Sequence, residues 1–172
     1  GLDASRIASI FDDWNQRGLS SYLIEITAAV LAEPDVATGK SLVDLIIDEA
    51  GQKGTGRWSV IEAQRLGVGA TTLEAAVAAR SMSAQRKERA RASEIYKGLQ
   101  AEDGQLALDQ EGIAELEAAL ETAKIIAYAQ GYEVMAAASV EFDWDLPMAE
   151  IARIWRAGCI IRSTFLQDIM SA

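Results

Sequence analysis

A long stripe of apolar residues at helical spacing runs through the second half of this sequence and decides its class of fold. The stripe recurs at every third or fourth position, as on one face of an α-helix, and comprises Ile113, Leu116, Leu120, Ala123, Ala127, Gln130, Val134 and Ala137. Several members are alanines, so neighbouring helices can approach this helix closely. Gly131 lies inside it at a cost of about 1 kcal/mol relative to alanine. Tight packing is the simplest explanation for that glycine.

Shorter helical patterns fill most of the remaining chain. We expect a first helix over 4–16 and a second that is capped by Ser20 or Ser21 and stops at Pro34. A loop over 33–40 and a short helix over Leu42–Ile47, capped by Ser41, follow. Further along we expect a charged and solvated helix face over 84–97, a loop over 98–108, and a last helical pair that starts near Pro147. No segment alternates apolar and polar residues over a useful length, so no strand is predicted. The sequence therefore predicts an all-α fold, a single multi-helix domain over 1–172 with long central helices.

Two capping-box patterns mark further helix starts. Ser59 with Glu62 predicts the start of one helix, and Thr71 with Glu74 predicts the start of the next, which runs past Arg80. In a capping box the hydroxyl accepts a hydrogen bond from a backbone N–H of the first turn, and the carboxylate reaches back to the cap. Both patterns precede apolar runs, as expected of helix N-termini.

The composition limits the partners and the location of the chain. Its 172 residues include 16 Lys and Arg against 26 Asp and Glu, which gives a formal net charge of −10. Such a surface repels nucleic acid and anionic membranes, and no apolar run reaches the roughly 18 residues of a membrane helix. No signal peptide is visible, and Cys159, the single cysteine, cannot form an internal disulfide. We therefore expect a cytoplasmic protein without a nucleic-acid or membrane partner.

Most common catalytic chemistries lack their residues here. There is no histidine, which removes the commonest general base and the commonest metal ligand. Gly67-Val68-Gly69 lacks the third glycine and the preceding strand of a dinucleotide fingerprint, and the loop from Gly51 to Arg57 lacks the ending of a P-loop. No two carboxylates form an obvious catalytic pair. We therefore assign no catalytic, cofactor-binding or metal-binding residue within this chain.

The segment Gly51-Gln52-Lys53-Gly54-Thr55-Gly56-Arg57-Trp58 is the clearest candidate for a binding site. Its three glycines let the backbone come close to a ligand or adopt positive φ. Lys53 and Arg57 supply positive charge, and Thr55 supplies a hydroxyl. With helical patterns on both sides, this loop is typical of an anion site.

Two cations, Lys53 and Arg80, are the best candidates for holding an anion. Arg80 falls on the apolar stripe of its predicted helix, where an unpaired buried charge is costly. It therefore either forms a structural salt bridge or faces a cleft, and Lys53 is more simply a solvated loop lysine. Together the two can grip a phosphate through charge-assisted hydrogen bonds. Arg57 and Arg162 are weaker candidates, and Arg162 is best read as a paired structural arginine.

Five segments, in order along the chain, resemble those of the decarboxylating 6-phosphogluconate dehydrogenase family. They are Leu19-Ser20-Ser21-Tyr22-Leu23-Ile24-Glu25-Ile26-Thr27, Ala50-Gly51-Gln52-Lys53-Gly54-Thr55-Gly56-Arg57-Trp58, Val77-Ala78-Ala79-Arg80, Ala123-Lys124-Ile125-Ile126-Ala127-Tyr128-Ala129-Gln130-Gly131 and Ile154-Trp155-Arg156-Ala157-Gly158-Cys159-Ile160-Ile161-Arg162. The motifs are specific and cover nearly the whole chain. Two departures are mild, since Arg57 stands where the family commonly has lysine and Ala157 where it has glycine.

The resemblance implies an activity and a site. This region corresponds to most of the family's all-helical C-terminal domain, in an enzyme that oxidatively decarboxylates 6-phosphogluconate, a phosphorylated sugar acid, to ribulose 5-phosphate with reduction of NADP. That reaction belongs to the pentose phosphate pathway and to gluconate utilisation. By residue-for-residue match, Lys53 and Arg80 bind the substrate phosphate, with Thr55 as a weaker candidate beside them. The long central helices form much of a homodimer interface in the family.

Parts that the family needs for catalysis are missing from the sequence. The Rossmann domain with its glycine fingerprint, and the catalytic lysine and glutamate, belong upstream of Gly1, and the tail that completes the partner's site belongs after Ala172. We therefore expect 1–172 to be a partial substrate-binding and dimerisation domain without NADP binding or catalysis of its own. Two alternatives remain open. One is a non-catalytic helical dimerisation or interaction module, and the other is a subunit that completes its site with a separate nucleotide-binding chain.

Overall fold

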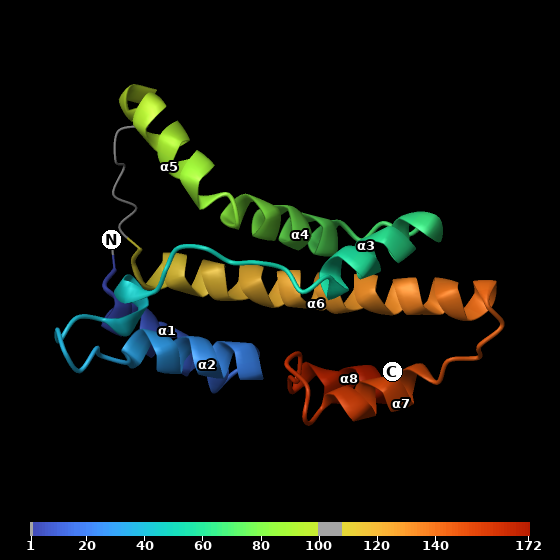
Figure 1. Cartoon of the computed structure of the whole chain (residues 1–172). Helices are drawn as coiled ribbons and strands as arrows, with labels where there is room; N and C mark the ends of the chain where they lie inside the picture. The colour runs from blue at the N-terminus through green and yellow to red at the C-terminus, as the bar shows by residue number, and fades with distance from the viewer. Residues whose placement is uncertain (1, 100–107) are drawn as a thin grey trace. The chain divides into compact units, whose positions relative to one another are not determined.

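The structure, a computed structural model, describes residues 2–99 and 108–172. Within them it contains eight α-helices, two short 3₁₀ helices and no sheet (Figure 1). The elements are α1 (Ala4–Asn15), α2 (Tyr22–Ala32), η1 (Leu42–Leu45), α3 (Thr55–Arg65), α4 (Thr71–Ser83), α5 (Arg86–Ile95), η2 (Lys97–Leu99), α6 (Gln110–Glu141), α7 (Met148–Trp155) and α8 (Phe165–Ser171). The all-α prediction is confirmed. The predicted loop over 98–108 lies mostly outside the described residues.

The chain divides into two compact units. One is built from the ranges Gly1–Ile46, Ala107–Thr122 and Pro147–Ala172, and the other from Ile47–Leu106 and Ala123–Leu146. The first unit holds α1, α2, α7, α8 and the start of α6, and the second holds α3, α4, α5 and the rest of α6. The candidate binding residues Lys53, Thr55 and Arg80 all belong to the second unit.

In the first unit, α1 packs against α2 around a small apolar core. Its members Ile10, Trp14 and Leu19 each expose at most 7% of their surface. Ser21 caps α2, because its hydroxyl accepts a hydrogen bond from the amide of Ile24 at 3.3 Å. One of the two serines expected at this position is therefore the N-cap.

The helix predicted over Leu42–Ile47 is shorter in the structure, where the helical residues are Leu42–Leu45. α2 ends at Ala32, before Pro34, and the loop that follows closes with a hydrogen bond from the amide of Asp35 to the carbonyl oxygen of Lys40 at 2.7 Å. The predicted short helix is the 3₁₀ helix η1, and Ser41 makes no side-chain cap there. Ser41 is therefore the N-cap residue, as expected, but without a capping hydrogen bond from its side chain.

The end of the chain completes the first unit. Leu166 on α8 is fully buried, and the amide of Tyr22 donates to the carbonyl oxygen of Arg162 at 3.1 Å. The guanidinium of Arg162 donates to the carbonyl oxygen of Cys159 at 3.0 Å and lies 3.6 Å from the centroid of the Tyr22 ring. Arg162 is therefore a paired structural arginine, as expected.

In the second unit, α3 begins earlier than the sequence predicted. The expected start was Ser59, but the helix begins at Thr55 with Gly54 as its N-cap. Gly54 has a φ of 102°, a left-handed conformation that suits a residue without Cβ, so the helix starts inside the glycine loop. The Ser59 hydroxyl lies within the helix and donates to the carbonyl oxygen of Thr55 at 3.1 Å. The predicted capping box of Ser59 and Glu62 is therefore wrong.

α4 begins at Thr71, close to the predicted position, but its capping box is also wrong. The N-cap is Ala70, and it makes no side-chain cap. The amide of Thr72 donates instead to Oε1 of Gln130 on α6, at 2.9 Å. Nε2 of Gln130 in turn donates to the Thr71 hydroxyl at 3.0 Å. A side chain from another helix therefore replaces the local cap.

The long helix is confirmed, but its environment differs from the one expected. α6 spans 32 residues, and none of them is buried in a single chain. A Cβ at Gly131 would meet no described atom within 4 Å outside the backbone of its own helix. The tight packing expected at Gly131 is therefore not found among the residues that the structure describes. Among the described helices, none is both long and apolar enough to cross a membrane.

Candidate functional site

The glycine loop and the first turn of α3 form one side of a hollow, and α4 forms the other. Its volume is about 400 Å³, within the range of small-molecule sites, about 300–1,000 Å³. The lining residues are Gln52, Lys53, Gly54, Thr55, Gly56, Leu73, Ala76, Val77 and Arg80. We call this site the α3–α4 hollow. It brings together Lys53, Thr55 and Arg80, the three residues selected from the sequence.

Lys53 lies directly before the N-cap of α3, and its side chain is exposed. No ion pair within the described chain involves Lys53 or Arg80. An ammonium group has three N–H donors and no acceptor. The lysine can therefore turn toward an anion in the α3–α4 hollow without breaking a contact of the folded chain.

Arg80 faces the hollow and is exposed, which corrects the expectation of a buried face. Its Nε donates to the carbonyl oxygen of Gly51 at 3.0 Å, and its Nη2 donates to the same oxygen. The side chain escapes burial because its partner is the loop backbone and not a second helix. A guanidinium has five N–H donors, so the remaining ones are left for a ligand.

The first turn of α3 adds backbone donors to the hollow. The first hydrogen bond within the helix runs from the amide of Trp58 to the carbonyl oxygen of Gly54 at 3.0 Å. The amides of Thr55, Gly56 and Arg57 therefore lack an acceptor inside the helix, and Gly54 has no side chain to cap them. The positive end of the helix dipole lies at this turn. Thr55 thus brings an amide as well as a hydroxyl to the site.

Gly56 allows α3 to lie close to α4 beside the hollow. A Cβ at this position would lie 3.2 Å from Cγ2 of Val77, which is tighter than ordinary van der Waals contact. A Cβ at Gly56 would require the Val77 side chain to shift by a few tenths of an ångström. The glycine therefore suits this close approach of α3 to α4 beside the hollow.

The charge of the hollow is opposite to that of the chain. Its lining contains Lys53 and Arg80 and no carboxylate, whereas the whole chain has a formal net charge of −10. A local group of cations with few nearby carboxylates concentrates anions. The arrangement suits a phosphate or a similar small anion.

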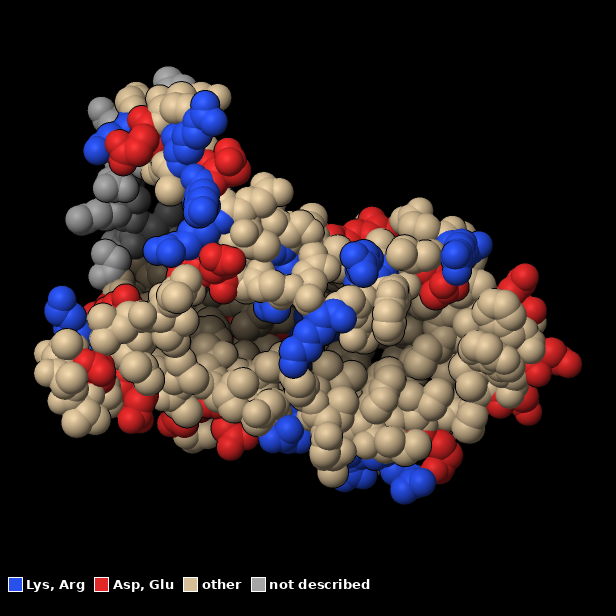
Figure 2. Space-filling model, viewed as in Figure 1, with Lys and Arg blue, Asp and Glu red and all other residues tan. Residues whose placement is uncertain are grey.

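Basic residues also gather over α5, as Figure 2 shows, but they form a different kind of surface. All residues of α5 are exposed except Arg89, which is half-buried. Arg89 donates to Oδ2 of Asp48 at 2.7 Å. The predicted solvated helix face over this segment is confirmed.

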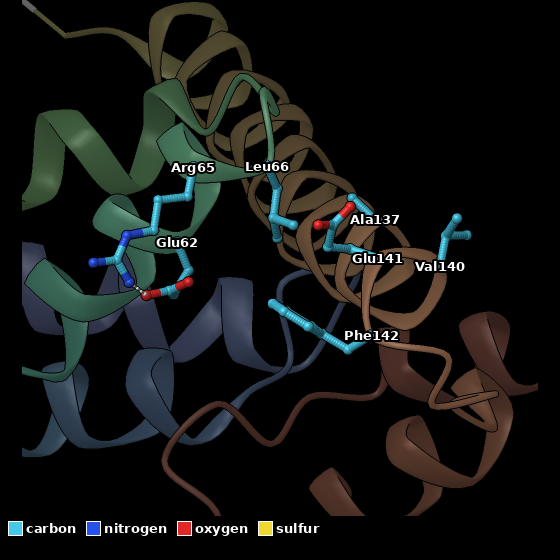
Figure 3. Close-up of a pocket in the computed structure, with 7 residues that line it drawn as sticks. All are labelled: Glu62, Arg65, Leu66, Ala137, Val140, Glu141 and Phe142. Atoms are coloured by element: carbon cyan, nitrogen blue, oxygen red, sulfur yellow. Dashed lines mark hydrogen bonds and ion pairs between the residues drawn. The ribbon is translucent and has the colours of Figure 1, made fainter.

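A larger hollow in the second unit is a poorer anion site. It has a volume of about 610 Å³ and is lined by Glu62, Arg65, Leu66, Ala137, Val140, Glu141 and Phe142 (Figure 3). Its one cation is already paired, since Arg65 donates to Oε1 of Glu62 at 2.7 Å. Glu141 adds a further negative charge. The sum of these charges disfavours an anion, so the α3–α4 hollow is the better candidate for an anion site.

The described residues do not fit a dinucleotide or a metal ion. Gly67 has a φ of 70° and follows the end of α3, so Gly67-Val68-Gly69 connects two helices and follows no strand. Within the described chain, no group of three or more His, Cys, Asp and Glu is placed to hold a metal. Gly67-Val68-Gly69 is therefore a turn between α3 and α4 and not part of a dinucleotide fingerprint.

Sequence reasoning missed the side chains that hold the loop beside the hollow. Nε2 of Gln52 donates to the Ser81 hydroxyl at 2.8 Å, across 29 positions of sequence. The amide of Ala50 donates to the Ser83 hydroxyl at 3.0 Å, across 33 positions. A glutamine in a glycine loop and two serines near the end of a helix are weak signals by themselves. Their pairing depends on how α4 lies against the loop.

Comparisons with known proteins agree on one family. The profile of the 6-phosphogluconate dehydrogenase C-terminal domain matches residues 1–172. The NADP(+)-dependent, decarboxylating 6-phosphogluconate dehydrogenase of Bacillus subtilis is 46% identical over 173 residues, which are 100% of this chain and 36% of that protein. The NAD(+)-dependent, decarboxylating enzyme of the same organism is 43% identical over 171 residues, 99% of this chain and 36% of that protein.

A solved structure agrees as well. Plasmodium falciparum 6-phosphogluconate dehydrogenase, described in its apo form and in complex with NADP+ and with its substrate 6-phosphogluconate, matches with a TM-score of 0.90. The sequence identity is 40%, and the match covers 99% of this chain and 37% of that chain.

Fold and site together define an all-α domain with one long helix and a cationic hollow at a helix N-terminus. The family match makes the assignment specific. The chain belongs to the 6-phosphogluconate dehydrogenase family and corresponds to its C-terminal domain. It spans 36–37% of the length of these relatives.

Proposed function

We propose that this chain supplies the substrate-phosphate site and the dimerisation surface of an NADP-dependent enzyme that oxidatively decarboxylates 6-phosphogluconate to ribulose 5-phosphate. The observation that carries the proposal is the shared hollow of Lys53, Thr55 and Arg80, which has no carboxylate in its lining. A phosphate group is doubly charged near neutral pH, so it gains from two cations at once. The names of the relatives support the choice of substrate.

Each residue has its own part in the proposed phosphate site. Lys53 donates from its ammonium group, Arg80 from the guanidinium N–H groups not bound to Gly51, and Thr55 from its amide and hydroxyl. Each hydrogen bond to a charged group contributes about 1.5–3 kcal/mol. These residues hold and orient the substrate, and we assign no catalytic residue to a chain that has no histidine.

NADP as the cofactor of the intact enzyme is supported by the name of one relative and by the solved complex. Two Bacillus subtilis relatives named for different cofactors are 46% and 43% identical to this chain. Because the two values are so similar, this region gives no reason to prefer one dinucleotide. We expect the residues that choose between NADP and NAD to lie outside 1–172.

A homodimer is the second part of the proposal, and the exposed surface of α6 supports it. Leu116 and Ile125 lie on opposite sides of the helix, about 180° apart, and are 46% and 42% exposed. Large apolar side chains that stay exposed on a helix can be covered by a partner chain. The open space at Gly131 leaves room for another chain to come close. The same surface would serve a non-catalytic dimerisation module, the alternative function.

We place the protein in the cytoplasm, in line with the thiol chemistry of the chain. Its single cysteine, Cys159, is half-buried and not in a disulfide. A lone reduced cysteine suits a reducing compartment. A relative named as chloroplastic, from spinach, shows that family members also occur in an organelle.

The test is a steady-state assay of the intact protein with 6-phosphogluconate and either dinucleotide. We expect Lys53→Ala and Arg80→Ala to raise KM roughly 10–100-fold, with a much smaller change in kcat. Lys53→Arg keeps the charge, and Arg57→Ala removes a nearby cation that does not line the hollow; both should change KM less. Unchanged KM in both alanine variants would disprove the site. A stable dimer without activity or phosphate binding would favour the non-catalytic module.

A further inference from the structure

The residues before α3 run alongside α4 (Figure 1). Three consecutive ones, Ala50, Gly51 and Gln52, form hydrogen bonds with residues of α4. The contacts, in chain order, join Ala50 N to Ser83 Oγ at 3.0 Å, Gly51 O to Arg80 Nε at 3.0 Å, and Gln52 Nε2 to Ser81 Oγ at 2.8 Å. We call these three contacts the loop clasp. The clasp ends at the residue that precedes Lys53, so the lysine is the first residue past a fixed segment.

Gln52 connects the loop clasp to the α3–α4 hollow. Its side chain lines the hollow, and its Nε2 donates to the carbonyl oxygen of Val77 at 3.2 Å as well as to Ser81. The Ser81 hydroxyl itself donates to the same Val77 oxygen at 3.0 Å. The Gln52 amide, the Ser81 hydroxyl and the Val77 carbonyl are thus joined pairwise by hydrogen bonds, in a triangle. Because Gln52 precedes Lys53 and Ser81 follows Arg80, this triangle ties together the backbone positions of the two cations.

We propose that Gln52 and Ser81 are positioning residues, which fix Lys53 relative to Arg80 before an anion binds. This inference rests on the proposed function of the hollow as a phosphate site. A glycine-rich loop loses conformational freedom when a ligand orders it. A loop that is ordered in advance avoids that loss on binding and so binds more tightly. Gln52 and Ser81 would therefore change affinity for phosphate without touching the reacting atoms.

The expected signature is a selective loss of phosphate affinity. In the intact protein, Gln52→Ala should raise KM for 6-phosphogluconate roughly 5–20-fold and leave kcat within about twofold. Inorganic phosphate, used as a competitive inhibitor, should lose affinity by a similar factor, because it would use the same two cations. Ser81→Ala should act in the same direction but less strongly, since Gln52 keeps its bond to Val77.

Two further variants and a control distinguish a positioning role from a general loss of folded structure. Ser81→Thr keeps the hydroxyl and should restore the KM of the unmodified protein. The double variant Gln52→Ala with Ser81→Ala should lose little more affinity than Gln52→Ala alone, because Ser81 acts through its contact with Gln52. Ser9→Ala is the matched control. Its hydroxyl donates to the carbonyl oxygen of Ser5 at 3.1 Å within α1, so KM should not change.

The outcomes of these experiments distinguish the positioning role of Gln52 and Ser81 from the phosphate site on which it rests. If Lys53→Ala raises KM while Gln52→Ala and Ser81→Ala leave it unchanged, the positioning role is wrong and the phosphate site stands. Strictly additive losses in the double variant would also overturn the positioning role. If Lys53→Ala changes neither KM nor phosphate inhibition, the phosphate site is wrong and the positioning role falls with it. Should Gln52→Ala fail to fold, Ser81→Ala and Ser81→Thr still decide the question.

Discussion

Oε1 of Gln130 accepts hydrogen bonds from both the amide and the hydroxyl of Thr72, at 2.9 and 2.6 Å. One side chain of α6 therefore holds the first turn of α4, the helix that carries Arg80. Arg80 lies eight residues further on, about 12 Å along the helix axis. Gln130 thus fixes the position of the helix without reaching the α3–α4 hollow.

Removal of this glutamine should destabilise the fold. Gln130→Ala leaves the half-buried amide of Thr72 without its partner, so we expect the free energy of unfolding to fall by about 1–3 kcal/mol. Urea denaturation followed by circular dichroism measures the change. The control is Gln16→Ala, which loses only an exposed hydrogen bond to Asp12 and should stay within about 0.5 kcal/mol. Equal effects in the two variants would contradict this account.

A second prediction concerns the left-handed residue at the start of α3. Gly54→Ala places a Cβ on a backbone with a φ of 102°, which should lower the free energy of unfolding by about 1–2 kcal/mol. The Cβ would meet no atom closer than 3.9 Å, so the loss is conformational and not a clash. Gly51→Ala is the control, because its Cβ would meet nothing within 4 Å and its φ is not positive. The idea fails if thermal or urea denaturation shows the same loss for both glycines.

A third prediction uses the open space at Gly131. Since no described atom lies near the position of its Cβ, Gly131→Ala should gain helix propensity and stabilise a single chain by up to about 1 kcal/mol. The measurement is the free energy of unfolding at a protein concentration low enough to keep the chain monomeric. A loss of stability that grows with concentration would show instead that a second chain occupies this space.

Local periodicity was enough to find the helices, but not their ends. The helix predicted over 4–16 is α1, and the long apolar stripe is α6, because a spacing of three and four residues is the repeat of an α-helix. The start expected at Ser59 was wrong, because the left-handed Gly54 begins the helix four residues earlier. The start at Thr71 was right but its capping box was wrong, because the Thr72 amide is bound by Gln130, which lies 58 positions away.

A fourth prediction concerns acid. The hydrogen bond from Arg89, followed by the charge of Arg89, holds the pKa of Asp48 below its ordinary value of 3.8. A carboxyl whose pKa is lower in the folded state adds stability above its unfolded pKa and loses it as the pH falls through the folded pKa. Any stability that Asp48 adds should therefore be present above about pH 4 and disappear at lower pH.

The measurement is the free energy of unfolding of the unmodified protein and of Asp48→Asn across the acid range. The difference between the two should be small, because the Asp48 side chain is 80% exposed, and it should shrink as the pH falls. A difference that widens in acid would contradict the assigned role of Arg89.

The candidate site could be predicted in part from the sequence, because some of its residues belong to local patterns. Lys53, Thr55 and Arg80 were selected from local charge, glycine spacing and a family resemblance, and the structure places all three in one hollow. Their role in binding stays a prediction. The loop clasp was not accessible, because Gln52 and Ser81 are 29 positions apart and neither residue is unusual in its own segment. Only the packing of α4 against the loop brings them together.

The exposed apolar surface of α6 also has a consequence for any measurement of heat stability. Leu116 and Ile125 remain 46% and 42% exposed in a single chain, so covering them with a second chain favours the folded state only. By mass action, the melting temperature should then rise with protein concentration and fall on dilution. For the proposed homodimer, a melting temperature is therefore meaningful only together with the concentration at which it was recorded.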